Sequence, residues 1–562
     1  MSAITTFECL STLSLQVGFE SLSVEQKYAF AKFTQGQNLF VTGPGGTGKT
    51  RLIQFLVEYM NSVGKSHQVC ALTGCAATLL NCKAKTIHSW SGVRLAKGVS
   101  ADIVNRVVRN RSLAKSWRST EVLIVDEVSM MSSKMFDLLD QIGRATRKCT
   151  GKPFGGIQLI FTGDFFQLPP IPDQGEPGSG EFCFQHPRWS ATFKAANCIE
   201  LQTFFRQTDP AYISILQEVR RGTISPANSD LLRTRLMKGP KVDRVDGIVP
   251  TKLFPVRAKV DTINESSYER LEGEERVYQF SVTTKAKTHI DTGTVLSAEE
   301  TEHCTELTSE QLSREVDTLI TSLFTEKTVR LKTGTLVMCT ANIDVERGIC
   351  NGSQGIVIGY ADLVPSAVLP DELLRGSGRP ISVPLVRFSN GVTMKVAPHQ
   401  RQSEEYPCIV VAQIPLCLAW ALTIHKIQGA TLDMAEMDIG RSIFAEGQSY
   451  VALSRVKTLE GLNLSEFNAT KIKANPLVVE FYDSFPKKGE DEMLAEIGAI
   501  LSTFAAPVQP TILKQASMQS FAVTKDTTKY TTHKDTTKEE TNPFSAFAEK
   551  DPTIKTVILS KY

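Results

Sequence analysis

A glycine-rich segment, VTGPGGTGKT (residues 41–50), has the residue types and spacing of a phosphate site. It matches G-x-x-x-x-G-K-[ST], follows an apolar run, and opens a segment whose Leu52, Phe55, Leu56 and Tyr59 recur at helical spacing. Glycines let backbone N–H groups close around phosphate oxygens, and a helix N-terminus adds positive potential. A glycine-rich turn without function is the disfavoured alternative. We therefore predict that these residues bind a triphosphate: Gly43, Pro44, Gly45, Gly46, Thr47, Gly48, Lys49 and Thr50.

Two acidic residues follow a second apolar run. In VLIVDE, four apolar residues precede Asp126 and Glu127. Asp126 is predicted to bind Mg²⁺ through water together with the Thr50 hydroxyl, and Lys49 to reach the β/γ-phosphates. Glu127 would take a proton from the attacking water. Two acids after a strand also suit a helix start, but their combination with the Lys49 loop favours the catalytic interpretation.

A third apolar run ends in polar residues and prolines, in GGIQLIFTGDFFQLPP (residues 155–170). Asp164 and Gln167 would leave a strand at the sheet edge where phosphates sit. The Gln167 amide can donate to a γ-phosphate and accept from water. The two prolines would stiffen the chain that follows the strand. A movement of Gln167 would then be passed on along the chain rather than absorbed locally. The alternative is a polar turn.

These residues require a sheet to position them. Short apolar runs alternate with helical patterns between residues 38 and 201: NLFVT, VCALT, EVLIVDE, IQLIFTGD and NCIEL. Such alternation predicts an α/β fold with a parallel sheet. A second set of α/β signals near residues 254, 420 and 450 is interrupted by an insert. The insert has short strands punctuated by Asn-Gly and Gly, the signature of a small antiparallel barrel.

Composition is that of a globular protein, with 41% hydrophobic and 22% charged residues among 562. The net charge of +2 gives no general support for nucleic-acid binding, so a polyanion would have to meet a local basic surface. The segment NRVVRNRSLAKSWR could line the path of a strand, although such a run is by default a solvated helix face. The 12 cysteines include no CxxC pair, which disfavours zinc. Without a membrane-length apolar run, a signal peptide or a clear mitochondrial presequence, we expect a soluble intracellular protein, nuclear or at a viral replication site in a host cell.

With these motifs in this order along the sequence, the chain resembles the Pif (petite integration frequency) family in the RecD/Pif group of superfamily-one helicases. The resemblance runs from about residue 21 to 466. The segments that carry it are FDLLDQIGRATRKCTGKPFGGIQLIFTGDFFQLPP, EFCFQHPRW, FFRQ, LVMCTANID, NGSQGIVIG, ALTIHKIQGATLD and YVALSRVKTLEGL. It implies two RecA-like lobes that bind ATP and Mg²⁺, 5′→3′ movement on single-stranded DNA, and strand separation in replication, repair, recombination or telomere maintenance.

The resemblance also implies domain boundaries. An N-terminal extension would cover residues 1–20 and the first lobe 21–200, with a wedge-like loop at about 170–185. The second lobe would combine 201–278 and 411–485. The insert with the small β-barrel would cover 279–410. Residues 486–562 would form a mostly disordered tail, because the repeated KDTTK composition near its middle cannot bury apolar area.

Further residue roles follow from the same mapping. Arg206 in FFRQ and Arg455 in ALSR would be arginine fingers, where a lone arginine otherwise suggests a surface ion pair. Gln26 would read adenine, although Ser23-x-x-Gln26 is itself a capping-box pattern. Gln428 would link nucleotide and DNA. The residues expected at the DNA are Thr73, His88, Trp90, Thr423, His425 and Lys426. Trp90 would stack on a base or, alternatively, lie in the core.

Partners and rival functions complete the expectations. QASMQSFA (residues 515–522) approximates the short motif that binds a sliding clamp, with Ala522 where an aromatic residue is usual. The free protein is expected to be a monomer that binds single-stranded and forked DNA. The rivals are a DNA-stimulated ATPase switch or loader that does not unwind, a nucleic-acid scaffold with a vestigial ATPase, and a viral replicative helicase.

Overall fold

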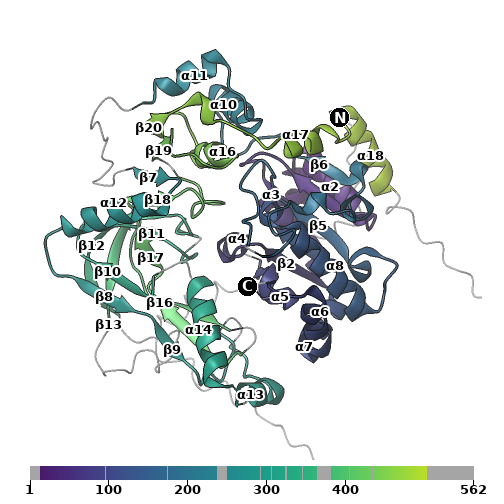
Figure 1. Ribbon diagram of the computed structural model, residues 1–562, viewed down its shortest axis with the longest axis horizontal. Helices are drawn as coiled ribbons and strands as arrows, with labels where there is room; N and C mark the ends of the chain where they lie inside the picture. Colours follow the sequence, from purple (N-terminus) through teal and green to yellow (C-terminus); the bar gives the residue numbers. More distant parts are fainter. Residues whose placement is uncertain are drawn as a thin grey trace, which may run out of the picture. The chain divides into compact units, whose positions relative to one another are not determined.

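The computed structural model describes residues 13–502, apart from residues 81, 95, 174, 237–249, 291–292, 306, 323–325, 345, 364–380, 404–405 and 433 (Figure 1). The wedge-like loop expected at 170–185 is thus described except for residue 174. The clamp-like segment 515–522 and the rest of the tail after residue 502 lie outside the described residues. No helix in the described part is both long and apolar enough to cross a membrane.

The first sheet has six strands in the order β3-β2-β4-β5-β1-β6, and every pairing is parallel. The strands are β1 (Leu39–Thr42), β2 (His67–Ala71), β3 (Lys85–Thr86), β4 (Val122–Asp126), β5 (Gln158–Thr162) and β6 (Cys198–Glu200). They are short apolar runs because helices bury both faces of the sheet. The parallel sheet predicted from the sequence is confirmed, and β1, β4 and β5 lie next to one another.

Successive residues of each strand belong to different cores. Phe40 packs into one apolar cluster, while Leu39 and Val41 pack into another, because side chains alternate across a sheet. The accompanying helices are α1 (Leu13–Glu20), α2 (Val24–Thr34), α3 (Lys49–Ser62), α4 (Gly74–Leu80), α5 (Ile87–Ser91), α6 (Ser100–Arg109), α7 (Arg111–Ser119), α8 (Ser133–Arg147) and α9 (Trp189–Thr192).

The second sheet is assembled from distant segments, as the interrupted pattern predicted. Its four strands follow the order β18-β7-β19-β20, all parallel: β7 (Thr251–Phe254), β18 (Ala421–Thr423), β19 (Ala435–Ile439) and β20 (Leu462–Phe467). The helices around it are α10 (Pro210–Arg220), α11 (Pro226–Arg233), α12 (Arg257–Glu269) and α16 (Gln448–Leu453). Helix α17 (Pro476–Asp483) packs instead against the first sheet, where Phe481 contacts Phe40 of β1.

Between β7 and β18 the chain forms antiparallel sheets. Five strands follow the order β14-β13-β12-β11-β17: β11 (Leu336–Cys339), β12 (Gln354–Leu363), β13 (Ile381–Phe388), β14 (Thr393–Lys395) and β17 (Leu416–Leu418). A three-stranded sheet contains β15 (His399–Gln402), β16 (Val410–Gln413) and β9 (Ser281–Thr283), and β10 (Thr328–Leu331) pairs with β8 (Arg276–Gln279). Helices α13 (Ala298–Thr305) and α14 (Ser309–Ser322) occupy the polar segment. None of the sheets formed by the described residues closes on itself, so a barrel is not confirmed.

A further helix corrects the expected start of the tail at residue 486. α18 (Glu490–Ser502) packs against α2, with Ile500 and Leu501 buried in the core that α2 also lines. Glu496 accepts a hydrogen bond from the Tyr28 hydroxyl at 2.9 Å and pairs with Lys32 at 3.1 Å. The folded chain therefore extends at least to the end of this helix.

Candidate nucleotide site

The glycine-rich loop lies between β1 and α3, as its sequence context predicted. α3 begins at Lys49, directly after Gly48, which has a φ of 82°. Gly46 has a φ of 96°, and a Cβ there would lie 2.6 Å from the Gln207 side-chain oxygen. At Gly48 a Cβ would lie 2.5 Å from the Gln26 amide nitrogen. Any larger residue at these two positions would strain the backbone and collide with a neighbour.

The loop presents hydrogen-bond donors without acceptors. Within the described part of the chain, no acceptor is found for the backbone N–H groups of Gly46, Gly48, Lys49 and Thr50. The Lys49 ammonium donates to the carbonyls of Gly43, at 2.6 Å, and Pro44, at 3.1 Å. Burial lowers the pKa of Lys49, partly offset by the carboxylates nearby. Unpartnered N–H groups and a half-buried ammonium suit an anion, so the residues present fit a phosphate group.

Asp126 is the last residue of β4, and Glu127 follows it. β4 pairs with β5, and β5 pairs with β1, the strand that precedes the glycine-rich loop. Asp126 accepts a hydrogen bond from the Thr162 hydroxyl at the end of β5. Glu127 takes a left-handed backbone conformation (φ 57°), and its carboxylate accepts from the Gln428 amide at 3.1 Å. Burial raises the pKa of Asp126 and of Glu127, and for Glu127 the Asp126 charge adds to the effect. Desolvated carboxylates favour a proton or a cation, which is consistent with a metal ligand and a base.

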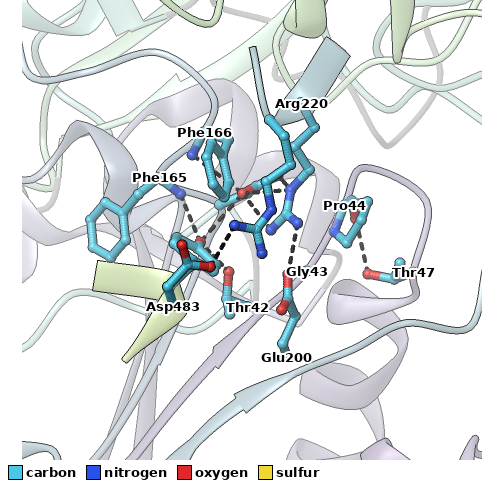
Figure 2. A network of polar contacts seen from close by, with 12 residues as sticks. Thr42, Gly43, Pro44, Thr47, Phe165, Phe166, Glu200, Arg220 and Asp483 are labelled. Atoms are coloured by element: carbon cyan, nitrogen blue, oxygen red, sulfur yellow. Dashed lines mark hydrogen bonds and ion pairs between the residues drawn. The ribbon is translucent and has the colours of Figure 1, made fainter. Parts of the chain in front are cut away.

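Asp164 takes part in a buried ion pair, and its expected contact with the nucleotide stays a prediction. It is fully buried and accepts hydrogen bonds from Arg220 of α10, at 3.0 to 3.2 Å, and from the hydroxyls of Tyr450, at 3.1 Å, and Tyr482, at 3.3 Å. Arg220 also reaches Glu200 at 2.7 Å (Figure 2). The described role of Asp164 is therefore to pair a buried guanidinium.

Gln167 has a buried polar atom without a partner, and its contact with the γ-phosphate stays a prediction. Its backbone N–H donates to the Asp164 carbonyl at 2.9 Å, which fixes the turn after β5. The side chain is 5% exposed, and its amide oxygen has no partner among the described residues. The Gln428 amide oxygen is unpartnered in the same way. Because buried polar atoms are normally hydrogen-bonded, both amides are available to a bound molecule.

Arg206 and Arg455 lie beside the loop. The Arg206 N–H donates to the Gly46 carbonyl at 3.3 Å, and its guanidinium to the Ser454 carbonyl at 3.2 Å. A Cβ on Gly45 would lie 3.4 Å from an Arg455 terminal nitrogen. Burial, with a further contribution from the Arg455 charge, lowers the pKa of Arg206 to about 10, and burial also lowers the pKa of Arg455.

Neither arginine forms an ion pair with a described acid. The surface ion pair considered from sequence therefore does not apply. Two desolvated guanidinium groups next to unpartnered N–H groups create a strong requirement for a bound anion.

Gln26 forms the capping box predicted as its alternative role. Ser23 caps α2, and the Gln26 side-chain oxygen accepts from the Ser23 N–H at 2.9 Å. The Gln26 amide nitrogen donates to the carbonyls of Thr47 and Gly48, at 3.3 and 3.1 Å. Gln26 thus holds the phosphate loop through the carbonyls of Thr47 and Gly48, and its contact with adenine stays a prediction.

The structure places the six residues expected at the DNA in different surroundings, and the Lys426 side chain is half-buried. Thr73 and Thr423 use their hydroxyls locally, accepting from the N–H groups of Ala76 and Lys426, each at 3.2 Å. The His88 side chain is half-buried, and burial lowers its pKa. The His425 side chain is exposed.

Trp90 is 5% exposed and packs against Trp117, with ring centroids 4.6 Å apart. It occupies the core, as its alternative assignment predicted, and its ring is not available for stacking on a base.

Several residues around the site were missed from sequence. Tyr450 precedes Arg455 in the quoted segment YVALSR, so its presence was visible but its contact was not. Gln207 likewise ends the quoted segment FFRQ, whereas Arg220 and Tyr482 lie outside every quoted segment. Their roles depend on contacts between residues far apart in the chain.

Comparison with known proteins shows which family this chain resembles. The family model for PIF1-like helicases matches residues 21–230, and that for the 2B domain of DNA helicase Pif1 matches residues 316–360. The human ATP-dependent DNA helicase PIF1 is 34% identical over 84% of this chain and 65% of its own length. The chain spans slightly less than two thirds of the length of the first curated relatives it matches.

Solved structures extend the likeness to the fold. A crystal structure of Pif1 helicase from Candida albicans matches with a TM-score of 0.64 and 32% identity, covering 83% of this chain and 99% of that one. A Bacteroides Pif1 helicase in complex with ADP-AlF3 and single-stranded DNA matches with a TM-score of 0.52 and 26% identity, covering 85% and 98%. The chain belongs to the Pif1-like helicase family.

Proposed function

We propose that this protein is an ATP-dependent DNA helicase that moves 5′→3′ on single-stranded DNA and separates duplex strands. The proposal rests on Arg206, which is half-buried, and Arg455, which is buried, beside the phosphate loop. Among the residues that the structure describes, neither arginine has an acidic partner and several loop N–H groups have no acceptor. The family membership and the relative bound to ADP-AlF3 and single-stranded DNA support the same function.

The site residues divide the work of hydrolysis. The loop N–H groups and Lys49 bind phosphate oxygens, and Thr50 and Asp126 are suited to hold Mg²⁺, which would neutralise phosphate charge when bound. Glu127 accepts the proton of the attacking water, helped by the raised pKa that burial gives it. Gln167 orients that water. Arg206 and Arg455 stabilise the charge that develops on the transferred phosphoryl oxygens.

A contact between distant segments offers a route from hydrolysis to movement. Gln428 belongs to the segment 423–428 expected at the DNA, and its amide donates to Glu127, the proposed base. A displacement of this segment along a strand therefore changes the surroundings of the catalytic carboxylate. Thr423, His425 and Lys426 would contact the DNA backbone without reading its sequence.

We also propose a domain assignment. Residues 21–200 and the pair 201–278 and 411–485 form two RecA-like lobes, each built on one of the two parallel sheets. The insert at 279–410, with its antiparallel strands, acts as a barrel-like module that guides the DNA. The loop at 170–185 would part the strands.

The test is an unwinding assay on forked duplexes with either a 5′ or a 3′ tail. ATP should release the strand from the 5′-tailed fork and leave the 3′-tailed fork annealed. Lys49→Ala should release neither, because it removes the ammonium at the loop. If the 5′-tailed fork stays annealed while DNA stimulates phosphate release, the protein is an ATPase switch rather than a helicase.

A further inference from the structure

The hydroxyl of Tyr450 connects the phosphate loop to the buried ion pair of Asp164. The Gly45 N–H donates to the Tyr450 oxygen at 2.9 Å, and the same hydroxyl donates to the Asp164 carboxylate at 3.1 Å. Tyr450 is 1% exposed. A continuous path of hydrogen bonds therefore runs from the loop amide through one phenol to the carboxylate paired with Arg220.

The direction of each bond on this path is fixed. Arg220 donates to Asp164 through two nitrogens, which keeps the carboxylate an acceptor. The single phenolic proton must therefore point to Asp164, and a lone pair is left for the Gly45 N–H. Burial and the nearby Asp164 carboxylate raise the pKa of Tyr450, so the phenol stays protonated.

Tyr450 is also close in sequence to one of the two arginines at the site. It lies in α16, and Arg455 follows that helix and donates to the Val451 carbonyl at 2.9 Å. A Cβ on Gly45, the residue held by Tyr450, would lie 3.4 Å from Arg455. The bond from Gly45 to Tyr450 thus fixes the loop relative to Arg455.

We propose that Tyr450 is a positioning residue, whose hydroxyl holds the phosphate loop in register with Arg455 and ties both to the Asp164–Arg220 pair. This inference rests on the proposed ATP-driven function and deepens it. The N–H groups of Gly46, Gly48, Lys49 and Thr50 remain free for phosphate. Tyr450 therefore acts on the alignment of the arginine rather than on phosphate binding itself.

The test compares Tyr450→Phe with Tyr212→Phe. Tyr212 is also fully buried, and its hydroxyl donates at 2.7 Å to the Leu453 carbonyl of the same helix, α16, but no contact to the loop is described for it. Tyr450→Phe should lower kcat for ATP hydrolysis roughly tenfold and change KM less than about threefold, since it removes one buried hydrogen bond near the reacting group. Tyr212→Phe should leave both within about twofold.

Hydrogen exchange provides a readout that needs no catalysis. In nucleotide-free protein, Tyr450→Phe should speed exchange in peptides covering the loop at least about fivefold, and Tyr212→Phe should not. Equal loop exchange and equal kcat in the two variants would overturn the proposal.

The outcomes also separate this inference from the proposed function. A wild-type protein that binds Mg-ADP but fails to unwind would remove the helicase assignment. The exchange difference between Tyr450→Phe and Tyr212→Phe would then still decide the role of Tyr450: its presence supports the proposal, and its absence overturns it.

Discussion

Replacing Asp164 with asparagine should destabilise the protein more than its small change in shape suggests. Asp164 is fully buried, and the Arg220 side chain it pairs with is 6% exposed and lies over the Phe166 ring at 4.6 Å. Removing one partner of a buried pair costs about 3–5 kcal/mol. Glu200 remains as an acceptor for Arg220 at 2.7 Å. We therefore expect a loss of about 3 kcal/mol, at the lower end of that range.

Thermal unfolding without nucleotide, near neutral pH, measures this loss. A cost of about 3 kcal/mol lowers Tm by roughly 6–12 °C in a domain of 150–250 residues. Glu200→Gln is the matched control: the Glu200 side chain is 22% exposed, so its loss should cost about 1 kcal/mol. If Asp164→Asn melts at the same temperature as Glu200→Gln, the argument that Asp164 compensates a buried charge is refuted.

Three further predictions concern other residues. Glu127→Gln should reduce phosphate release by about 10²–10⁴-fold. The same variant should not lower Tm at pH 7. Burial raises the pKa of Glu127, so its charged form opposes folding as pH rises, and glutamine removes that charge. Normal phosphate release in Glu127→Gln would exclude Glu127 as the base. Trp90→Ala should cost about 3–5 kcal/mol of stability in urea melts, whereas Trp90→Phe should keep normal DNA affinity by fluorescence anisotropy; a selective loss of affinity in Trp90→Phe would restore the stacking role. Hydrogen bonds from Lys488, which has the largest effect, and from Tyr28 lower the pKa of Glu496 to about 2. The charged carboxylate therefore stabilises the fold at neutral pH, and this contribution disappears as the pH falls through that value. Glu496→Gln should lack this contribution at neutral pH. Solvent screening limits this loss to about 1 kcal/mol, and urea melts at pH 7 should show it shrinking in high salt.

The sequence was most informative where one short segment fixes both geometry and chemistry. The loop from Gly43 to Thr50 was predictable because a strand, several glycines and a helix start occur in order within it. Asp126 and Glu127 were predictable because the carboxyl ends of neighbouring parallel strands meet at one edge. Local apolar runs also indicated the parallel sheets, since strands buried on both faces lack alternation.

Contacts between distant residues were beyond that reasoning. Asp164 pairs with Arg220, 56 positions away, and receives a bond from Tyr450, 286 positions away. No periodicity marks such pairs, because each residue taken alone suits an exposed site equally well. Trp90 shows the same difficulty: an aromatic residue suits a core and a base, and only its packing on Trp117 decides.

Two features of the structure, helix α18 and the strands of the insert, have signals in the sequence that predict them only in part. Ile497, Ile500 and Leu501 recur at helical spacing, which indicated α18 within the acidic segment assigned to the tail. The strands of the insert were predictable from their Gly and Asn-Gly punctuation, but closure into a barrel was not. Closure depends on strand tilt and stagger, which a list of strands does not contain.

The pairing of β7 with β18 has a consequence for how the protein is made. Leu253 lies beside Leu422, so one strand leaves the ribosome long before its neighbour. The first sheet needs nothing beyond Glu200 for its strands, whereas the second waits until Phe467 has been translated. At about 5–20 residues per second, the roughly 210 residues after β7 take on the order of 10–40 s. During that interval β7, with the apolar side chains of Leu253 and Phe254, has no partner strand, and chaperone capture of nascent chains should concentrate there.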